Sequence, residues 1–183
     1  FICGTAVGSP SNPVSTIGAY AAILKELGEP LHFPATEVVW TAHLNVTDVS
    51  LLSKAMVWAA TEPRCAGEAF NIVNGDTFCW RDMWPMIADN FGMKPGELRA
   101  TKLRDFMSDK DGVWKKIAEE KGLRFLNVDA VADWAFADVM FAGAWDQTAS
   151  VVKAHHYGFS EMVDTEEMFQ RLFGQYRELG ILP

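Results

Sequence analysis

The stretch Phe1–Pro13, FICGTAVGSPSNP, holds the signals of a strand, a turn and the start of a helix. Phe1 to Val7 is apolar and β-prone, which predicts a buried strand. Gly8 to Asn12 is typical of a turn. Asn12 suits the cap of the next helix and Pro13 its first position. Strand, turn and helix in this order indicate an α/β architecture.

The rest of the chain alternates short extended segments with longer helical ones. A strand closed by an Asn-Gly-Asp turn is predicted at 68–76, and Pro85 is expected in the first turn of its helix, where amides are unpaired. The strands are few and short, which fits the tail of a doubly wound sheet joined to a largely helical subdomain. Extended segments are predicted at 30–34, 43–47, 68–76 and 94–101, and helices at 13–27, 48–61, 80–91, 102–121, 128–145 and 165–178, with 149–157 open between helix and strand.

Length and composition limit the classes of function. A chain of 183 residues, 49% hydrophobic and 22% charged, can form one sizeable core. Its net charge of −8 argues against nucleic-acid and anionic-membrane partners, which need basic patches. No apolar run approaches about 18 residues, so no membrane-spanning helix is predicted. Three cysteines without C-x-x-C spacing, Cys3, Cys65 and Cys79, indicate reduced thiols and a cytoplasmic protein.

The residues expected of a complete nicotinamide-dependent enzyme are missing from the sequence. Gly4 and Gly8 lack the third glycine of a pyrophosphate-binding turn. Tyr20 and Lys25 stand five apart, so on a helix they point to different faces and cannot act as a catalytic Tyr-x-x-x-Lys pair. We therefore assign no catalytic residue within the chain.

Other polar residues have simpler structural explanations. His155 and His156 are adjacent, so their side chains diverge, and His43 lacks partner ligands; no metal site is predicted. Asp48 is interpreted as a helix cap, and Asn74 as part of a hydrogen-bonded turn. The seven Trp and twelve Phe are assigned mainly to the core, although such enrichment also suits an apolar substrate pocket.

Several blocks of the sequence resemble one family along essentially the whole chain. The most specific is EAFNIVNGDTFCWRDMWPMIADNFG at 68–92, in which an Asn-Gly-Asp turn precedes spaced tryptophans. ICGTAVGSPSNPVSTIGAYAAILKELGEPLHFPA, DWAFADVMF, KAHHYGF and the final ILP agree with it. The chain is similar to the C-terminal part of the progesterone 5β-reductase and iridoid synthase-like group of extended short-chain dehydrogenases/reductases.

The resemblance implies a Rossmann fold with a smaller substrate domain, and reduction of an enone- or enal-type C=C or C=O with NADP(H) or NAD(H). Residues 1–183 would then be a single C-terminal fragment, comprising the last Rossmann strands and the substrate subdomain. The nucleotide-binding half and the catalytic Tyr and Lys would lie upstream of Phe1. By resemblance, Ile2, Ser9, Pro10 and Ser11 contact the cofactor, and Ser11 and Phe136 line the substrate site.

Two alternatives remain beside this interpretation. One is an epimerase or dehydratase of nucleotide sugars, although the low count of basic residues disfavours a sugar diphosphate. The other is a non-catalytic small-molecule binding module, for which the strands are few. We expect the 183-residue chain alone to be inactive and to bind NADPH weakly. A homodimer is compatible with the sequence.

Overall fold

Two separate pairs of short parallel strands organise the molecule. The computed structural model describes residues 1–183. In the first pair Ile2 lies opposite Thr47, and in the second the register shifts between Leu31 and Phe33. Helices fill the intervals between the paired strands, so the predicted α/β class is confirmed. The pairs are β1 (Ile2–Cys3) with β3 (Thr47–Asp48), and β2 (Leu31–Phe33) with β4 (Pro95–Leu98).

Helices make up most of the regular structure, and the two longest, α1 and α9, pack against one another. The α-helices are α1 (Pro13–Glu26), α2 (Glu37–Thr41), α3 (Val49–Thr61), α4 (Trp80–Asn90), α5 (Leu103–Phe106), α6 (Asp111–Lys121), α7 (Trp134–Met140), α8 (Val152–His156) and α9 (Thr165–Glu178). Two 3₁₀ helices are η1 (Pro63–Cys65) and η2 (Val128–Ala130).

Side-chain caps explain where three helices begin. The Asn12 side chain accepts from the amide of Val14, and Pro13 is the first residue of α1. Asp48 caps α3 and Asp164 caps α9 in the same way. Each cap satisfies amides that have no partner within the helix. These three predicted helix starts are confirmed.

The predicted strands at 1–7 and 68–76 are wrong in extent. Only Ile2–Cys3 pairs as a strand, because the next backbone groups bond to side chains: the Gly4 carbonyl accepts from Asn12 and Tyr176. Residues 68–76 are extended but form only isolated contacts, such as the Gly75 bridge to 163. Both segments are held mainly by contacts outside a strand ladder.

Three helix predictions also need correction. The single helix predicted at 102–121 is divided into α5 and α6. Pro85 lies in the second turn of α4, where it removes the amide that would bond to the Arg81 carbonyl. Both residues are exposed, so water can satisfy that carbonyl. The single helix predicted at 128–145 is instead η2 followed by α7, because Asp133 caps a new helix start. Segment 149–157 forms the helix α8.

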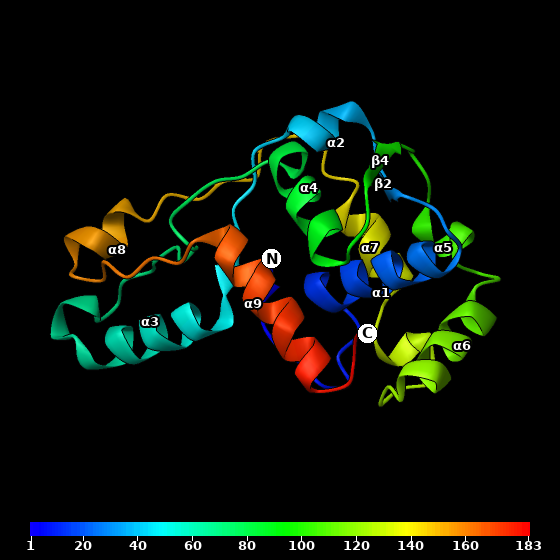
Figure 1. The fold of residues 1–183 in the computed structure, drawn as a ribbon. Coiled ribbons are helices and arrows are strands. Elements are labelled where there is room, and N and C mark those ends of the chain that lie inside the picture. The colour runs from blue at the N-terminus through cyan, green and yellow to red at the C-terminus, as the bar shows by residue number, and fades with distance from the viewer.

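The core and a projecting arm are distinct in Figure 1. α1, α4, α7 and α9 gather around one large hydrophobic cluster. Its centre is aromatic: the Phe33 ring lies 4.8 Å from Trp40 and 5.1 Å from Trp84, measured between centroids. α3 and α8 extend away from this body and share a small cluster of Leu51, Ala55, Ala154 and Phe159. No helix combines the length and apolar character required to cross a bilayer.

Candidate functional site

The segment 4–11 between β1 and α1, here called the N-terminal loop, contains three of the predicted cofactor-contacting residues. Its two ends are tied together by Asn12, which is 7% exposed. The Asn12 side-chain amide donates to the Gly4 carbonyl at 2.9 Å, while its oxygen caps α1. The loop therefore closes on the same residue that starts the helix, which fixes its shape locally.

Helix α9 supports the loop from the other side. The Tyr176 hydroxyl donates to the Gly4 carbonyl and accepts from the Ala6 amide, both at 3.1 Å. Burial raises the pKa of Tyr176, so this hydroxyl keeps its proton and remains a donor. The Thr5 hydroxyl donates to Gln175 at 2.7 Å. Sequence reasoning missed these contacts, because Tyr176 reads as one more apolar residue on the buried face of its helix.

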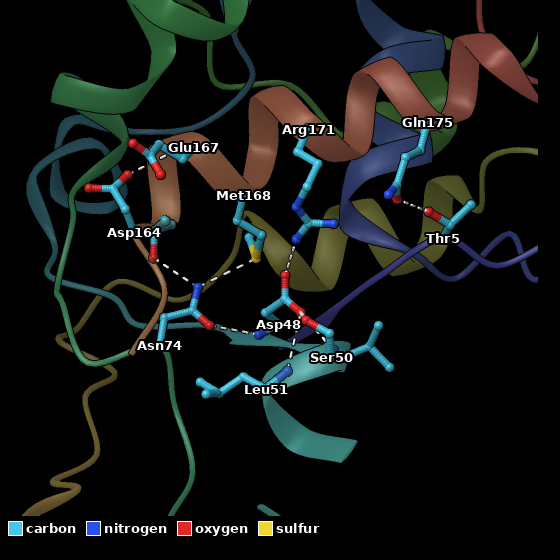
Figure 2. Close-up of polar contacts among 12 residues, drawn as sticks. Thr5, Asp48, Ser50, Leu51, Asn74, Asp164, Glu167, Met168, Arg171 and Gln175 are labelled. Carbon is cyan, nitrogen blue, oxygen red and sulfur yellow. Dashed lines mark hydrogen bonds and ion pairs between the residues drawn. The ribbon is translucent and has the colours of Figure 1, made fainter. Parts of the chain in front are cut away.

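A buried polar network fixes α9 relative to β3 and the turn at 74–76 (Figure 2). Asn74 is fully buried; its oxygen accepts from the Asp48 amide at 2.7 Å and its nitrogen donates to Thr165 at 3.0 Å. Asp48 also accepts from Ser50 and forms an ion pair with Arg171. Burial alone raises the pKa of Asp48, but the Ser50 hydrogen bonds and Arg171 together outweigh it and hold that pKa below its usual range. The network positions the helix that carries the loop's supports.

Asp133 joins the N-terminal loop to the start of α7. The Ser11 hydroxyl donates to the Asp133 carboxylate at 2.8 Å. The Asp133 amide donates to the Pro10 carbonyl at 3.1 Å. The same carboxylate accepts from the Phe136 amide. That bond, together with the bond from Ser11, outweighs the effect of burial and holds the pKa of Asp133 below its usual range. Ser11 and Phe136, predicted for one substrate site, are thus linked through one residue that the sequence analysis did not assign.

The remaining predicted residues, Ile2, Ser9 and Pro10, lie on β1 and in the N-terminal loop. Ile2 is 57% exposed on β1. Its neighbour Phe1 packs edge-to-face on Phe136, with ring centroids 5.9 Å apart. Ser9 is exposed and Pro10 is half-buried in the loop. The structure therefore brings Pro10, Ser11 and Phe136 together through Asp133, and Phe1, the neighbour of Ile2, contacts Phe136.

The loop also presents unpaired backbone donors. The amides of Val7, Gly8 and Ser11 donate no hydrogen bond within the chain. Gly8 has φ of 74°, a left-handed conformation that glycine adopts without strain. A turn of small residues with free amides ahead of a helix N-terminus suits polar oxygens of a bound molecule.

Two hollows flank this region. One, of about 390 Å³, is bordered by Pro10, Arg104, Asp129 and the segment 132–135. The other, of about 350 Å³, is bordered by Phe1, Leu44, Asn45, Val73 and the segment 145–149. Both fall at the lower end of the volumes that ligand pockets occupy.

The segment 145–149 is pinned beside the second hollow and presents an exposed tryptophan. The Gln147 amide donates to the His43 carbonyl at 2.8 Å, and the His43 amide donates to Asp146 at 2.8 Å. Trp145 at the start of this segment remains 65% exposed. An exposed ring at the rim of a hollow offers an apolar wall, and no pattern in the sequence separates Trp145 from the core tryptophans.

No group in the site is arranged as a nucleophile with its base. Burial raises the pKa of the Cys3 thiol to about 12, so it stays protonated. Tyr20 donates to the His32 carbonyl inside the core, whereas Lys25 donates to the Phe91 carbonyl. The two side chains thus bond to separate parts of the fold. None of these groups forms an acid–base pair within the site.

The similarity of this chain to known proteins shows its family. The profile of the PRISE-like Rossmann-fold domain matches residues 12–183. The chain belongs to the PRISE-like Rossmann-fold family. It is 34% identical to an (S)-8-oxocitronellyl enol synthase of Nepeta racemosa and 32% identical to a 3-oxo-Delta(4,5)-steroid 5-beta-reductase of Arabidopsis thaliana, each covering 100% of this chain and 47% of the relative. A short chain dehydrogenase, gsfE of Penicillium aethiopicum, is 31% identical over 97% of this chain and 52% of its own length.

Membership of the PRISE-like family confirms the resemblance drawn from the 68–92 block. In the structure this block has a clear role, because its residue Asn74 is the centre of the network in Figure 2. The chain spans about half the length of the curated relatives that it matches.

Proposed function

We propose that the whole protein is an NAD(P)H-dependent reductase of the C=C or C=O bond in an enone- or enal-type compound. In this proposal the 183-residue chain supplies the substrate-side part and one wall of the nicotinamide site. Two kinds of support carry it: relatives named as an enol synthase and a steroid reductase, and the N-terminal loop with its free amides. The decisive observation is that Asp133 couples this loop to the helix that bears Phe136.

The residues present fit a nicotinamide cofactor, which when bound supplies the hydride. Ile2, Ser9, Pro10 and Ser11 would contact it, with the free loop amides facing its polar groups. Tyr176 keeps the loop in place from behind, so the amides are held before a ligand arrives. Choice between NADP and NAD is left open by these residues.

The substrate would lie against Phe136, with Phe1 and Trp145 completing an apolar wall. Phe1 already packs on Phe136, and both Phe1 and Trp145 border the second hollow. Aromatic side chains bury large areas at little entropic cost, which suits a hydrophobic carbonyl compound. In the hollow beside Pro10, Arg104 is the only cationic lining residue, and Asp129 and Asp133 line the same hollow. That charge balance disfavours a sugar diphosphate, which calls for several cationic clamps.

Oxidation of NADPH or NADH by the full-length gene product, assayed with a panel of enones, enals and ketones, tests the proposed activity. Turnover of at least one of them is expected, and no turnover with either cofactor would refute it. The isolated 183-residue chain should bind NADPH weakly; calorimetry showing micromolar affinity would contradict its assignment as the substrate-side half.

Phe136→Ala tests the substrate wall in the active full-length protein. We expect KM to rise about tenfold while kcat changes less, because a lost ring contact is worth about 1.4 kcal/mol. Phe125→Ala is the matched control, since Phe125 is also partly buried but, unlike Phe136, makes no ring contact with Phe1. Equal effects of the two substitutions on KM would remove Phe136 from the substrate site.

A further inference from the structure

A hollow at the far end of α1 from the N-terminal loop gathers three cations, Lys25, Lys121 and Arg177. It has a volume of about 440 Å³ and is here called the basic hollow. The C-terminal ends of α1, α4, α6 and α9 meet around it. Lys25 follows Pro13 by twelve positions, about 18 Å along α1 at the usual rise per residue, so this hollow is separate from the two that flank the loop.

Arg177 is the most constrained of the three cations. Its Nε donates to the Pro183 carbonyl at 3.0 Å, and a terminal nitrogen donates to the Asn90 carbonyl at 2.9 Å. Its guanidinium also lies over the Phe91 ring, 4.8 Å from the centroid. None of these partners is an aspartate or a glutamate, and burial lowers the pKa of Arg177. The charge is therefore held in a fixed place with no acidic side chain to balance it.

The two lysines add charges that are likewise without a carboxylate partner. Lys25 donates to the Phe91 carbonyl at 2.6 Å, which leaves two of its three N–H donors free. Unlike Lys116 on the same helix, Lys121 forms no ion pair. Glu26 is the one acidic side chain that lines the basic hollow, and Lys116 already pairs with it at 2.6 Å.

The surrounding helix ends use only part of this positive charge. Each helix C-terminus carries about −0.5 charge, so the four ends together contribute about −2. Three unit charges exceed that sum. Asn90 adds a further donor: its side-chain oxygen is buried without a partner, which leaves its NH2 group as the end open to the hollow. The basic hollow therefore favours an anion that accepts hydrogen bonds.

We propose that the basic hollow binds the oxyanion group of a small molecule, held between Lys25, Lys121 and Arg177. The planar guanidinium presents N–H donors that match two oxygens, and the lysines act as point charges. Phosphate and carboxylate groups share this chemistry. A ligand that bridges α1, α6 and α9 stabilises the folded protein when it binds. The inference goes beyond the proposed reduction and does not depend on it.

Lys121→Gln and Lys115→Gln provide a matched test with inorganic phosphate as the probe. Both lysines are exposed on α6, but only Lys121 lines the basic hollow. Thermal unfolding of the full-length gene product is followed in about 20 mM phosphate and in chloride of equal ionic strength, which separates binding from screening. We expect phosphate to raise Tm above the chloride value by about 3 °C in the wild type and in Lys115→Gln. In Lys121→Gln the rise should be smaller by about 2 °C.

The comparison of the two variants isolates the basic hollow. Phosphate held at a nucleotide site elsewhere in the protein, or excluded from its surface, raises Tm equally in both. Equal phosphate effects in Lys121→Gln and Lys115→Gln would overturn the inference, and so would equal Tm values of the wild type in phosphate and chloride. The three cations would then serve only the helix ends and Pro183. Neither measurement uses turnover, so either failure leaves the proposed reductase activity standing.

Discussion

Replacing Asn74 by alanine tests the buried network that holds α9 behind the N-terminal loop. The substitution leaves the buried Asp48 amide without its acceptor and removes the donor to Thr165. A buried amide without a partner costs about 1–3 kcal/mol, and the lost bond to Thr165 adds about 1 kcal/mol. Thr165 retains its bond to Asp76, so the effect stays within this range. We expect Asn74→Ala to lower the free energy of unfolding by about 2–4 kcal/mol.

The measurement is equilibrium unfolding in urea at pH 7, followed by tryptophan fluorescence and far-UV circular dichroism. With a slope of about 2 kcal/mol/M, the expected change moves the midpoint down by about 1–2 M. Asn71→Ala is the matched control: Asn71 is exposed, and its side chain makes one long contact of 3.5 Å to the Ser150 carbonyl. The control should change stability by less than about 0.5 kcal/mol. Equal midpoints for the two variants would refute the view that Asn74 organises this region.

Two further substitutions probe the same region. The folded-state pKa of Asp48 is depressed, so its contribution is complete above its unfolded pKa of about 4 and is lost as pH falls through the folded value. Between about pH 5 and pH 2, unfolding midpoints of the wild type should therefore fall more steeply than those of Asp48→Asn, and parallel slopes would contradict this. Gly75→Ala should lower the free energy of unfolding by at least about 1 kcal/mol more than Gly122→Ala in urea titrations. Both glycines have positive φ (109° and 64°), but only at Gly75 would an added Cβ meet Met162. Equal losses of stability would show that the Met162 side chain moves aside freely.

The N-terminal loop is held from two sides within residues 1–183. Asp133 ties it to the helix that bears Phe136, and the Tyr176 hydroxyl bonds to the Gly4 carbonyl. Substitutions at Phe136 should accordingly change KM.

The sequence by itself determined the family, the α/β class and most helix starts. Asn12, Asp48 and Asp164 bond to amides two or three residues ahead, so the signal for each helix start lies within a few neighbouring letters. The 68–92 block identified the family in the same way, as a short pattern. The extent of the strands was overestimated, because an apolar run shows that a segment is extended and buried but not which groups its backbone will bond to.

Only the tertiary structure decided how the candidate site is assembled. Ser11 and Asp133 are separated by 122 positions, and Gly4 and Tyr176 by 172, so no local pattern relates them. The exposure of Trp145 likewise depends on where the 145–149 segment is pinned, since seven chemically identical tryptophans look alike in the sequence. Local hydrogen bonds are encoded by neighbouring residues, whereas contacts across the fold exist only once the core has brought distant segments together.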